Sequence, residues 1–370
     1  MLAAAALLVL VSMLVRLAAL PAANIDTVGY ITWYNTLLER GIPRTLATHF
    51  TTYSPPYTYL LALATLTRGF LPALSAIKLL PTLFSAASAL LVYRLVRVRY
   101  ARGGLPHLAA ALYFAAPTVI LNTSFWGQAD AIYTFFLLLC LYFLVRERNL
   151  AALTSLGVAL AFKAQAAFLL PLILILVLRR QIGWPSLSAL PAPYLLAIAP
   201  TVLLGRPLLD ALLVYVKQAG VYSDLSLNAG NPYLFIPTAW ESFVVPAGLV
   251  LAALALTYWS RRTARSPFPL DARGLVFCAL LSVLLAPYLL PKMHERYFFP
   301  ADVFAILFAF FWPRLWFAPI LMQVSSTLSY LPFLFGWDPA IVGLSFLSNT
   351  GLIAILLQAQ EALAARAPAT

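Results

Sequence analysis

Asp26 is the first residue whose type and position could do chemistry. It follows an apolar run over residues 2–20, so its carboxylate lies at a boundary where partial burial can raise its pKa and make it a general base. Asp is also a preferred N-cap residue, and a helix that begins at Thr27 would use it in that way. Position alone favours the cap, and the two roles can coexist.

A denser cluster of titratable side chains lies at 291–297, where an apolar run ends in Pro-Lys-Met-His-Glu-Arg-Tyr. An interfacial anchor needs only a long basic side chain and an aromatic ring. Here His294, Glu295 and Arg296 stand together. The guanidinium offers a planar fork of donors that suits a phosphate, and the imidazole adds a tunable donor. Phosphate binding and interface anchoring are therefore equally open for this cluster.

Two further stretches could meet a polar ligand. Trp126, Gln128 and Asp130 follow an apolar run, and an amide with a carboxylate suits sugar hydroxyls. The alternative is a tight turn between helices with Trp126 as an interfacial aromatic residue. Lys163 lies inside an apolar stretch, where an unpaired ammonium is costly, so it predicts a functional group unless its side chain snorkels.

The first long loop carries His49 and then a stiff double-proline turn at 53–57, which begins with Tyr53. A lone loop histidine is more typical of plain surface. The sequence has no Walker motif, dinucleotide glycine fingerprint or His/Cys metal spacing, so nothing in it indicates use of ATP or a nucleotide sugar. Cys140 and Cys278 both lie in apolar runs and predict packing rather than a disulfide framework.

The elements that must position these residues are apolar. Of the 370 residues 63% are hydrophobic and 10% charged, with a mean hydropathy of +0.90, which predicts an all-α, polytopic transmembrane helix bundle. The expected segments are 2–20, 74–96, 107–124, 129–145, 150–162, 165–179, 188–204, 243–259, 272–290, 298–312, 315–334 and 340–357. The fifth and sixth of these twelve are short for a crossing of about 20 residues, and predict two helices that meet at a cavity-lining turn.

Charge predicts how the bundle is oriented. The 24 basic residues are scattered between apolar runs, which argues against a nucleic-acid partner and for membrane orientation. If 2–20 is a retained helix that runs outward, most basic residues fall inside and most acidic residues outside, with both termini cytoplasmic. We expect one domain, 1–370, with outer loops at 21–73 and 205–242, the first carrying an interfacial helix at 27–40.

Taken in order, these stretches resemble the GT-C superfamily of integral-membrane glycosyltransferases. The chain looks most like the dolichyl-phosphate-glucose-dependent glucosyltransferases of N-glycan assembly and their shorter bacterial relatives. The stretches that carry the resemblance are Asp26 with Tyr30, Trp33 and the turn Gly41-Ile42-Pro43; Tyr53-Ser54-Pro55-Pro56-Tyr57; Trp126-Gly127-Gln128-Ala129-Asp130; Ala161-Phe162-Lys163-Ala164-Gln165 ahead of Pro171; and His294-Glu295-Arg296-Tyr297.

The resemblance implies a hexosyltransferase, either a glucosyltransferase or a mannosyltransferase, at the outer face of what we expect to be a bacterial plasma membrane. Its donor would be a polyprenyl-phosphate sugar, its acceptor a glycan, lipid or protein, and a single displacement would invert the anomeric centre. The implied roles are Asp26 as catalytic base; His294, Arg296 and Lys163 at the donor phosphate; and Trp126, Gln128, Asp130, Tyr53, His49 and Glu295 as substrate contacts.

Two departures from the family pattern bear on metal dependence. Ser54 stands where an acidic residue is common before the double proline, and no second acid stands beside Asp26. Both argue against a metal-binding acidic pair, and no cofactor is expected beyond the lipid-linked donor. A secondary transporter or lipid-linked-sugar flippase is the alternative function, although the inverted repeats expected of many transporters are absent from the sequence. A structural membrane subunit would leave the motif at His294 unexplained.

Overall fold

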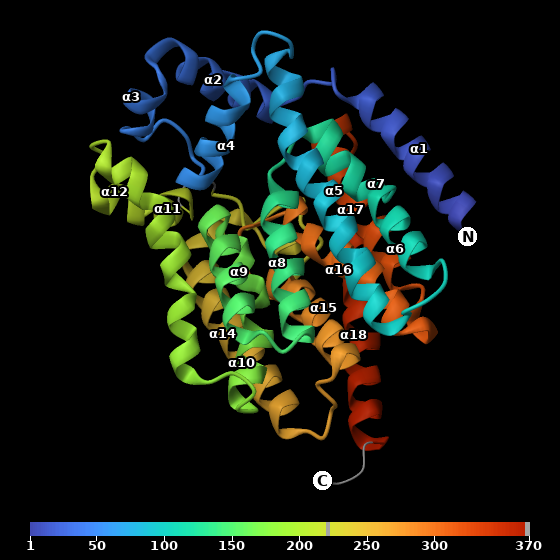
Figure 1. Ribbon diagram of the computed structural model, residues 1–370. Helices are drawn as coiled ribbons and strands as arrows, with labels where there is room; N and C mark the ends of the chain where they lie inside the picture. Colours follow the sequence, from blue (N-terminus) through green and yellow to red (C-terminus); the bar gives the residue numbers. More distant parts are fainter. Residues whose placement is uncertain (220–222, 367–370) are drawn as a thin grey trace.

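The apolar runs form helices, the structure that satisfies every backbone polar group within its own segment. The computed structural model describes residues 1–219 and 223–366, and they are almost entirely helical (Figure 1). Seven helical stretches are long and apolar enough to cross a membrane: Leu2–Ala19, Ala73–Arg99, Trp184–Leu203, Thr238–Arg265, Ala272–Leu289, Pro313–Phe335 and Pro339–Arg366.

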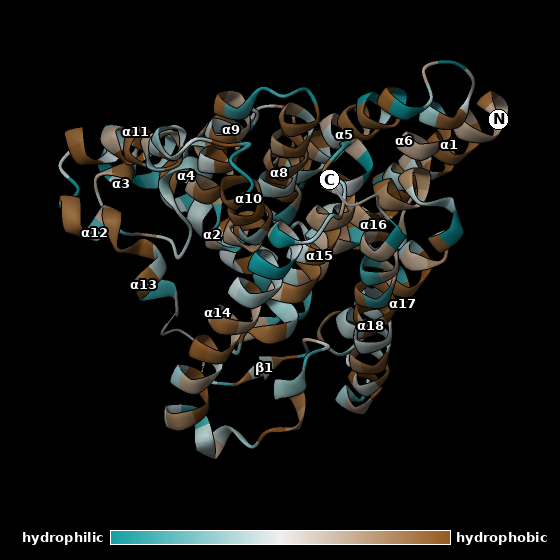
Figure 2. Cartoon of the chain, turned by 90° about the horizontal axis from the view of Figure 1, so that it is seen from below, coloured by the Kyte–Doolittle hydropathy of each residue, from teal (hydrophilic) through white to brown (hydrophobic). Residues whose placement is uncertain are grey.

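An eighth crossing is formed if a bent pair counts as one, since Leu105–Phe114 and Pro117–Trp126 meet at 50°. Three further apolar helices, at Asp130–Val145, Asn149–Phe162 and Ala164–Leu178, are shorter than these. The described chain therefore has the helices of a polytopic membrane protein, while the count of twelve crossings stays a prediction. Many large hydrophobic side chains on the long helices are exposed, and brown segments, which mark hydrophobic residues, recur along these helices in Figure 2.

The centre of the bundle is built from α15 and α16, whose side chains are buried over nearly their whole length. The principal helices are α1 (Leu2–Ala19), α5 (Ala73–Arg99), α6 (Leu105–Phe114), α7 (Pro117–Ile120), α8 (Asp130–Val145), α9 (Asn149–Phe162), α10 (Leu170–Leu178), α11 (Pro191–Leu203), α14 (Glu241–Arg265), α15 (Ala272–Leu289), α16 (Phe299–Phe311), α17 (Ala318–Phe335) and α18 (Val342–Arg366). A π-helical turn, η1 (Leu121–Trp126), continues α7.

Short elements gather at one end of the bundle, which we call the loop end (upper left in Figure 1). They are α2 (Ile25–Arg40), α3 (Ile42–Leu46), α4 (Pro55–Thr65), α12 (Leu208–Leu212), α13 (Val214–Ala219), β1 (Ser226–Leu227), η4 (Pro232–Phe235), β2 (Met293–His294) and η6 (Glu295–Phe298). The helix expected at 27–40 is thus confirmed as α2, and a further helix, α4, begins at the double proline. The predicted loop at 205–242 includes 220–222, which lie outside the described residues.

One pair of very short strands ties two loops together. β1 and β2 are parallel, with Ser226 opposite Met293 and Leu227 opposite His294. The amide of Lys292 also donates to the Leu225 carbonyl at 2.7 Å. This contact fixes the backbone of the His294 motif against the second long loop.

Candidate functional site

A cavity of about 500 Å³ opens at the loop end, and residues far apart in sequence line it. Its wall is formed by the start of α2, the segment before α4, the break after α9, residues of α13 and α14, and the segment at 291–297. Of the predicted site residues, those that line the cavity are Asp26, Tyr53, Lys163, His294 and Arg296. A larger groove of about 980 Å³ between α1, α5 and α6 is mostly apolar and holds none of them.

Asp26 is not the N-cap of α2, which corrects the interpretation that position alone favoured. Asn24 holds that place, because its side chain accepts from the Thr27 amide at 3.1 Å while the Thr27 hydroxyl accepts from the Asn24 amide at 2.8 Å. Asp26 instead accepts, on Oδ2, from Trp126 Nε1 at 2.8 Å and from Gln128 Nε2 at 2.6 Å. The carboxylate is therefore aimed by two fixed donors and is available for chemistry.

Those two donors belong to a buried support behind the cavity. Trp126 is fully buried and stacks on Phe333 with the ring centroids 4.7 Å apart, so the alternative of an interfacial aromatic residue is wrong. Gln128 is equally buried, and its Oε1 accepts from the hydroxyls of Tyr30 at 3.0 Å and Tyr53 at 3.3 Å. These bonds set which way the amide points, so its NH₂ group must face Asp26.

The helix break predicted around Lys163 is present and fully capped. Lys163 is extended between α9 and the 3₁₀ turn η2 (Ala164–Leu169). The last carbonyls of α9 find partners from the loops. The single proton of the Tyr215 hydroxyl is shared between the carbonyls of Leu160 and Ala161, 2.7 and 3.0 Å away, and the Ser54 hydroxyl donates to the Phe162 carbonyl at 2.9 Å. A buried helix end needs such partners, and here they bring Lys163 to the cavity wall.

Asp130 is the partner of Lys163. Its Oδ1 accepts from the Lys163 ammonium, and its Oδ2 accepts from Asn122 Nδ2 at 3.0 Å. Both charged side chains are almost completely buried, so each charge is compensated by the other inside the bundle. Asp130 supports the cavity from behind and does not line it.

The cluster at 294–296 combines one cation with two groups that burial keeps close to neutral. Arg296 Nη1 lies 3.2 Å from His294 Nδ1 and 3.6 Å from Glu295 Oε1. Burial, reinforced by the positive charges of Arg296 and Lys163, lowers the pKa of His294 to about 2. Burial also raises the pKa of Glu295 to about 7, although Arg296 opposes that rise.

Five predicted residues lie off the cavity wall. Trp126, Gln128, Asp130 and Glu295 are buried behind it, so their substrate contacts stay predictions. The first three form hydrogen bonds to Asp26 or Lys163, which line the cavity. His49 lies elsewhere, with its Nδ1 3.4 Å from Asp210 Oδ1.

Some lining residues were missed by sequence reasoning. Tyr215 and Gln218 come from α13 in the second long loop, where no motif distinguished them. Val245 and Leu249 come from α14, which the sequence marked only as an apolar run. Tyr30, one of the residues that carry the resemblance, also lines the cavity.

No protein-family model and no curated protein matches the chain. The functional assignment therefore depends on the geometry of the site. Within the described residues no three His, Cys, Asp or Glu side chains converge in a way that could hold a metal ion. The cavity therefore contains a carboxylate held by two donors, together with three basic residues, Lys163, Lys292 and Arg296, and a histidine. Such a site can take a proton from a hydroxyl and bind an anion nearby.

Proposed function

We propose that this chain is an integral-membrane glycosyltransferase of the GT-C type. It transfers a hexosyl group from a polyprenyl-phosphate-linked donor to an acceptor hydroxyl. The observation that carries the proposal is a single cavity in which Asp26 and the group Lys163, His294 and Arg296 share one wall, although they come from three distant parts of the chain. These are the residue types that an acceptor hydroxyl and a departing phosphate require.

The apolar part of the same wall supports a lipid-linked substrate. Ile25 is 75% exposed and Leu249 is 49% exposed, yet both line the cavity beside the charged groups. In a membrane protein, exposed apolar side chains at the rim of a polar cavity face lipid. A prenyl chain could therefore lie along α14 while its phosphate reaches the cations.

The proposed reaction is one displacement at the anomeric carbon. The acceptor oxygen forms the new bond to that carbon as Asp26 takes its proton. The bond from the carbon to the phosphate oxygen breaks, and its electron pair leaves with the polyprenyl phosphate. Arg296, the Lys163 ammonium and the His294 ring stabilise that phosphate. The phosphate is already a good leaving group, so no general acid of the glycosidase kind is required.

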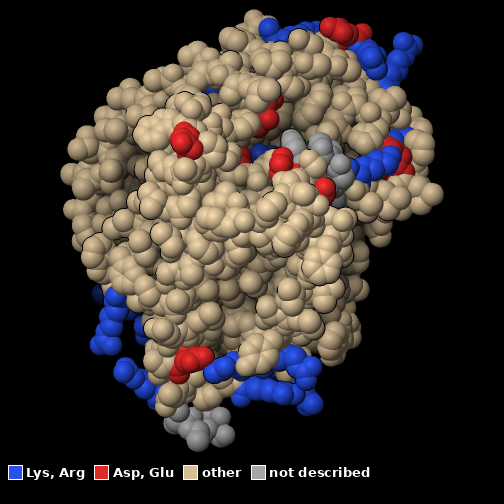
Figure 3. Space-filling model, turned by 180° about the vertical axis from the view of Figure 1, so that it is seen from behind, with Lys and Arg blue, Asp and Glu red and all other residues tan. Residues whose placement is uncertain are grey.

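Orientation belongs to the same proposal. Figure 3 shows Lys and Arg crowded at the end opposite the loop end, with most of the visible acidic residues in the other half. By the positive-inside tendency that basic end is cytoplasmic, and so are both termini. The cavity then opens at the outer face of a plasma membrane, with about twelve segments in the full GT-C arrangement.

The catalytic base can be tested with Asp26→Asn. The variant should lower transfer from a polyprenyl-phosphate hexose by roughly 10²–10⁴-fold, because the amide cannot take the proton. Donor binding should change little. Glu39→Gln is the matched control, since Glu39 is an exposed acid on the same helix, α2. Undiminished turnover in Asp26→Asn would remove Asp26 from the mechanism.

The phosphate role can be tested with His294→Ala, which should weaken binding of the lipid phosphate. Unchanged affinity would count against that role. The same preparation in proteoliposomes separates transfer from transport: a labelled covalent product supports the glycosyltransferase. Substrate that accumulates inside without any covalent product would instead favour the transporter or flippase.

A further inference from the structure

The ring nitrogens of His294 are distinguished by one contact. Arg296 Nη1 lies 3.2 Å from His294 Nδ1. A guanidinium has five N–H donors and no acceptor, so the hydrogen bond must run from Arg296 to Nδ1. Nδ1 then carries a lone pair and no proton. A neutral ring with Nδ1 unprotonated has its proton on Nε2.

Arg296 is held firmly enough to impose this choice. Its guanidinium lies over the rings of Trp126 and Tyr297, with its central carbon 5.7 and 5.6 Å from the two centroids. Its Nε is 4.0 Å from Asp130 Oδ2, and its side chain is only 13% exposed. These two cation–π contacts restrict the guanidinium, whose buried Nε has no hydrogen-bond partner among the described residues.

The surroundings of His294 disfavour a second proton on its ring. Among the described residues, Arg296 from its own segment and Lys163 from the break after α9 both bring positive charge to it. Tyr297 lies beside the ring with the centroids 5.0 Å apart. An imidazolium here would be a third buried cation, which is why the pKa of His294 lies far below its usual range.

We propose that Arg296 is a positioning residue that locks His294 in the neutral tautomer protonated at Nε2, which makes the ring a hydrogen-bond donor at every physiological pH. In the proposed reaction, that donor serves the phosphate of the polyprenyl-phosphate donor. This last clause rests on the proposed function, whereas the tautomer does not. Arg296 thus has two tasks, a direct charge for the anion and control of the neighbouring ring.

The tautomer can be read by nitrogen NMR on protein labelled with ¹⁵N-histidine. The chain has only three histidines, and the signals of His294 are assigned by their loss in His294→Gln. Between pH 5 and 8 the wild-type ring should show one neutral form, protonated at Nε2. A protonated ring at pH 6, or a ring protonated at Nδ1 alone, would overturn the lock.

Two substitutions of Arg296 sharpen the test. In Arg296→Met the donor to Nδ1 and one positive charge are lost, so His294 should exchange between its two neutral tautomers, and its pKa should rise while burial and Lys163 still hold it below the ordinary value. Arg296→Lys keeps a donor and a charge and should preserve the neutral form. If His294 behaves identically in Arg296→Met and wild type, Arg296 does not control the ring.

Binding of polyprenyl phosphate without sugar gives a second readout. Wild-type affinity should not follow a histidine titration between pH 8 and pH 5. In Arg296→Met affinity should fall at every pH in this range, because the direct charge for the anion is lost. A histidine titration in the wild-type profile would contradict the lock. Loss of sugar transfer with the tautomer intact would refute the proposed function and leave this inference standing.

Discussion

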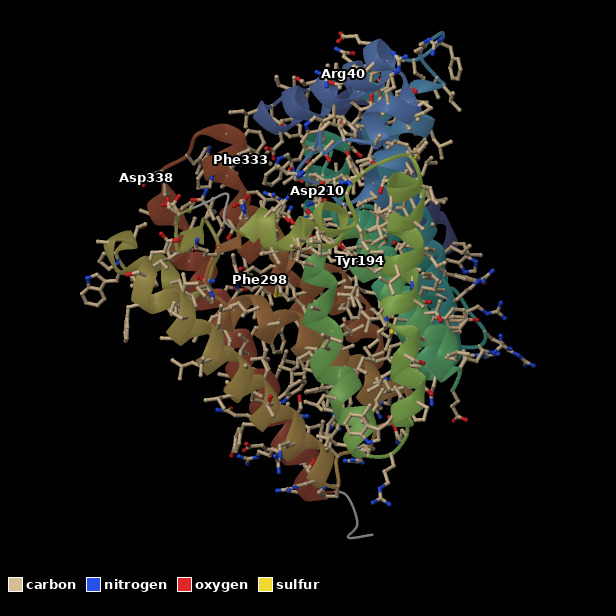
Figure 4. The ribbon with its side chains drawn as sticks, turned by 90° about the vertical axis from the view of Figure 1, so that its left-hand side faces the viewer. Arg40, Tyr194, Asp210, Phe298, Phe333 and Asp338 are labelled. Atoms are coloured by element: carbon tan, nitrogen blue, oxygen red, sulfur yellow. The ribbon has the colours of Figure 1, made fainter. Side chains whose placement is uncertain are left out.

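Two carboxylates, Asp130 and Asp210, each lie close to more than one basic side chain, but they differ in how far they are buried. Asp130 pairs with Lys163, and their side chains are 0% and 4% exposed. Asp210 pairs with Lys217 and accepts from Arg206 Nε at 2.7 Å, but its side chain is 16% exposed and that of Lys217 is 48% exposed. Figure 4 places Asp210 on the outside of the loop half, whereas Phe298 lies deeper in the bundle.

The degree of burial, rather than the types of charged residue, distinguishes the Asp130 pair behind the cavity from the Asp210 cluster nearer the surface. The Asp130 pair lies at a helix break and supports a cavity wall. The Asp210 cluster joins the first long loop, through His49, to the helices of the second. Removing a charge should therefore have unequal consequences at the two places.

The largest effect is expected at the buried pair. Asp130→Asn leaves the Lys163 ammonium without its counter-charge inside the bundle, which should cost roughly 3–5 kcal/mol of stability. Thermal denaturation of the protein in detergent measures this loss of stability. The double variant Asp130→Leu with Lys163→Met removes both charges and should recover much of the stability. A double variant as unstable as the sum of its parts would show that the pair does not act as a unit.

Sequence reasoning succeeded where hydropathy and helical periodicity decide the outcome. The helix at 27–40 and the break at Lys163 follow from such patterns, because an apolar stripe and an intramembrane charge constrain the backbone directly. The grouping of Asp26 with His294 and Arg296 was also expected, and in the structure all three line one cavity.

The features that could not be predicted from the sequence depend on a choice between residues that suit the same position equally well. Asn24 and Asp26 are both good N-cap residues two positions apart, so the choice of Asn24 is visible only in the folded backbone. Trp126 suits an interface or a buried stack, and its neighbour Phe333 lies far along the chain. His49 meets Asp210 through a fold of two loops for which no local pattern exists.

An intermediate effect is expected at Glu295, which is buried like Asp130 but has no fully matched counter-charge. Burial raises its pKa from 4.5 to about 7, so the folded state prefers the protonated acid. Stability from this group is present below pH 4.5 and is lost as pH rises toward 7. One pKa unit corresponds to about 1.4 kcal/mol, so the free energy of unfolding should fall by roughly 2–3 kcal/mol between pH 5 and pH 8.

Glu295→Gln tests this slope, because the amide stays neutral throughout. The variant should match wild type near pH 5 and exceed its stability near pH 8, measured as the unfolding temperature in one detergent. Glu361→Gln is a suitable control, since Glu361 is an exposed acid that pairs with Arg262 at the opposite end. Equal pH slopes for wild type and Glu295→Gln would mean that Glu295 is ionised in the folded protein.

The smallest effect is expected at Asp210, and a large effect there would contradict the difference drawn between the two carboxylates. Burial acts to raise the pKa of Asp210, but hydrogen bonds from Lys217 and Arg206 outweigh it and lower the pKa to about 2. The ionised form is therefore favoured by folding, and its contribution is lost only as pH falls below 4 toward 2. At neutral pH Asp210→Asn should cost less than Asp130→Asn, since water can solvate Lys217, which is 48% exposed, and the buried Arg206 still meets an amide oxygen at position 210. A loss as large as that of Asp130→Asn would show that the junction of the two loops, and not the buried pair alone, holds the cavity together.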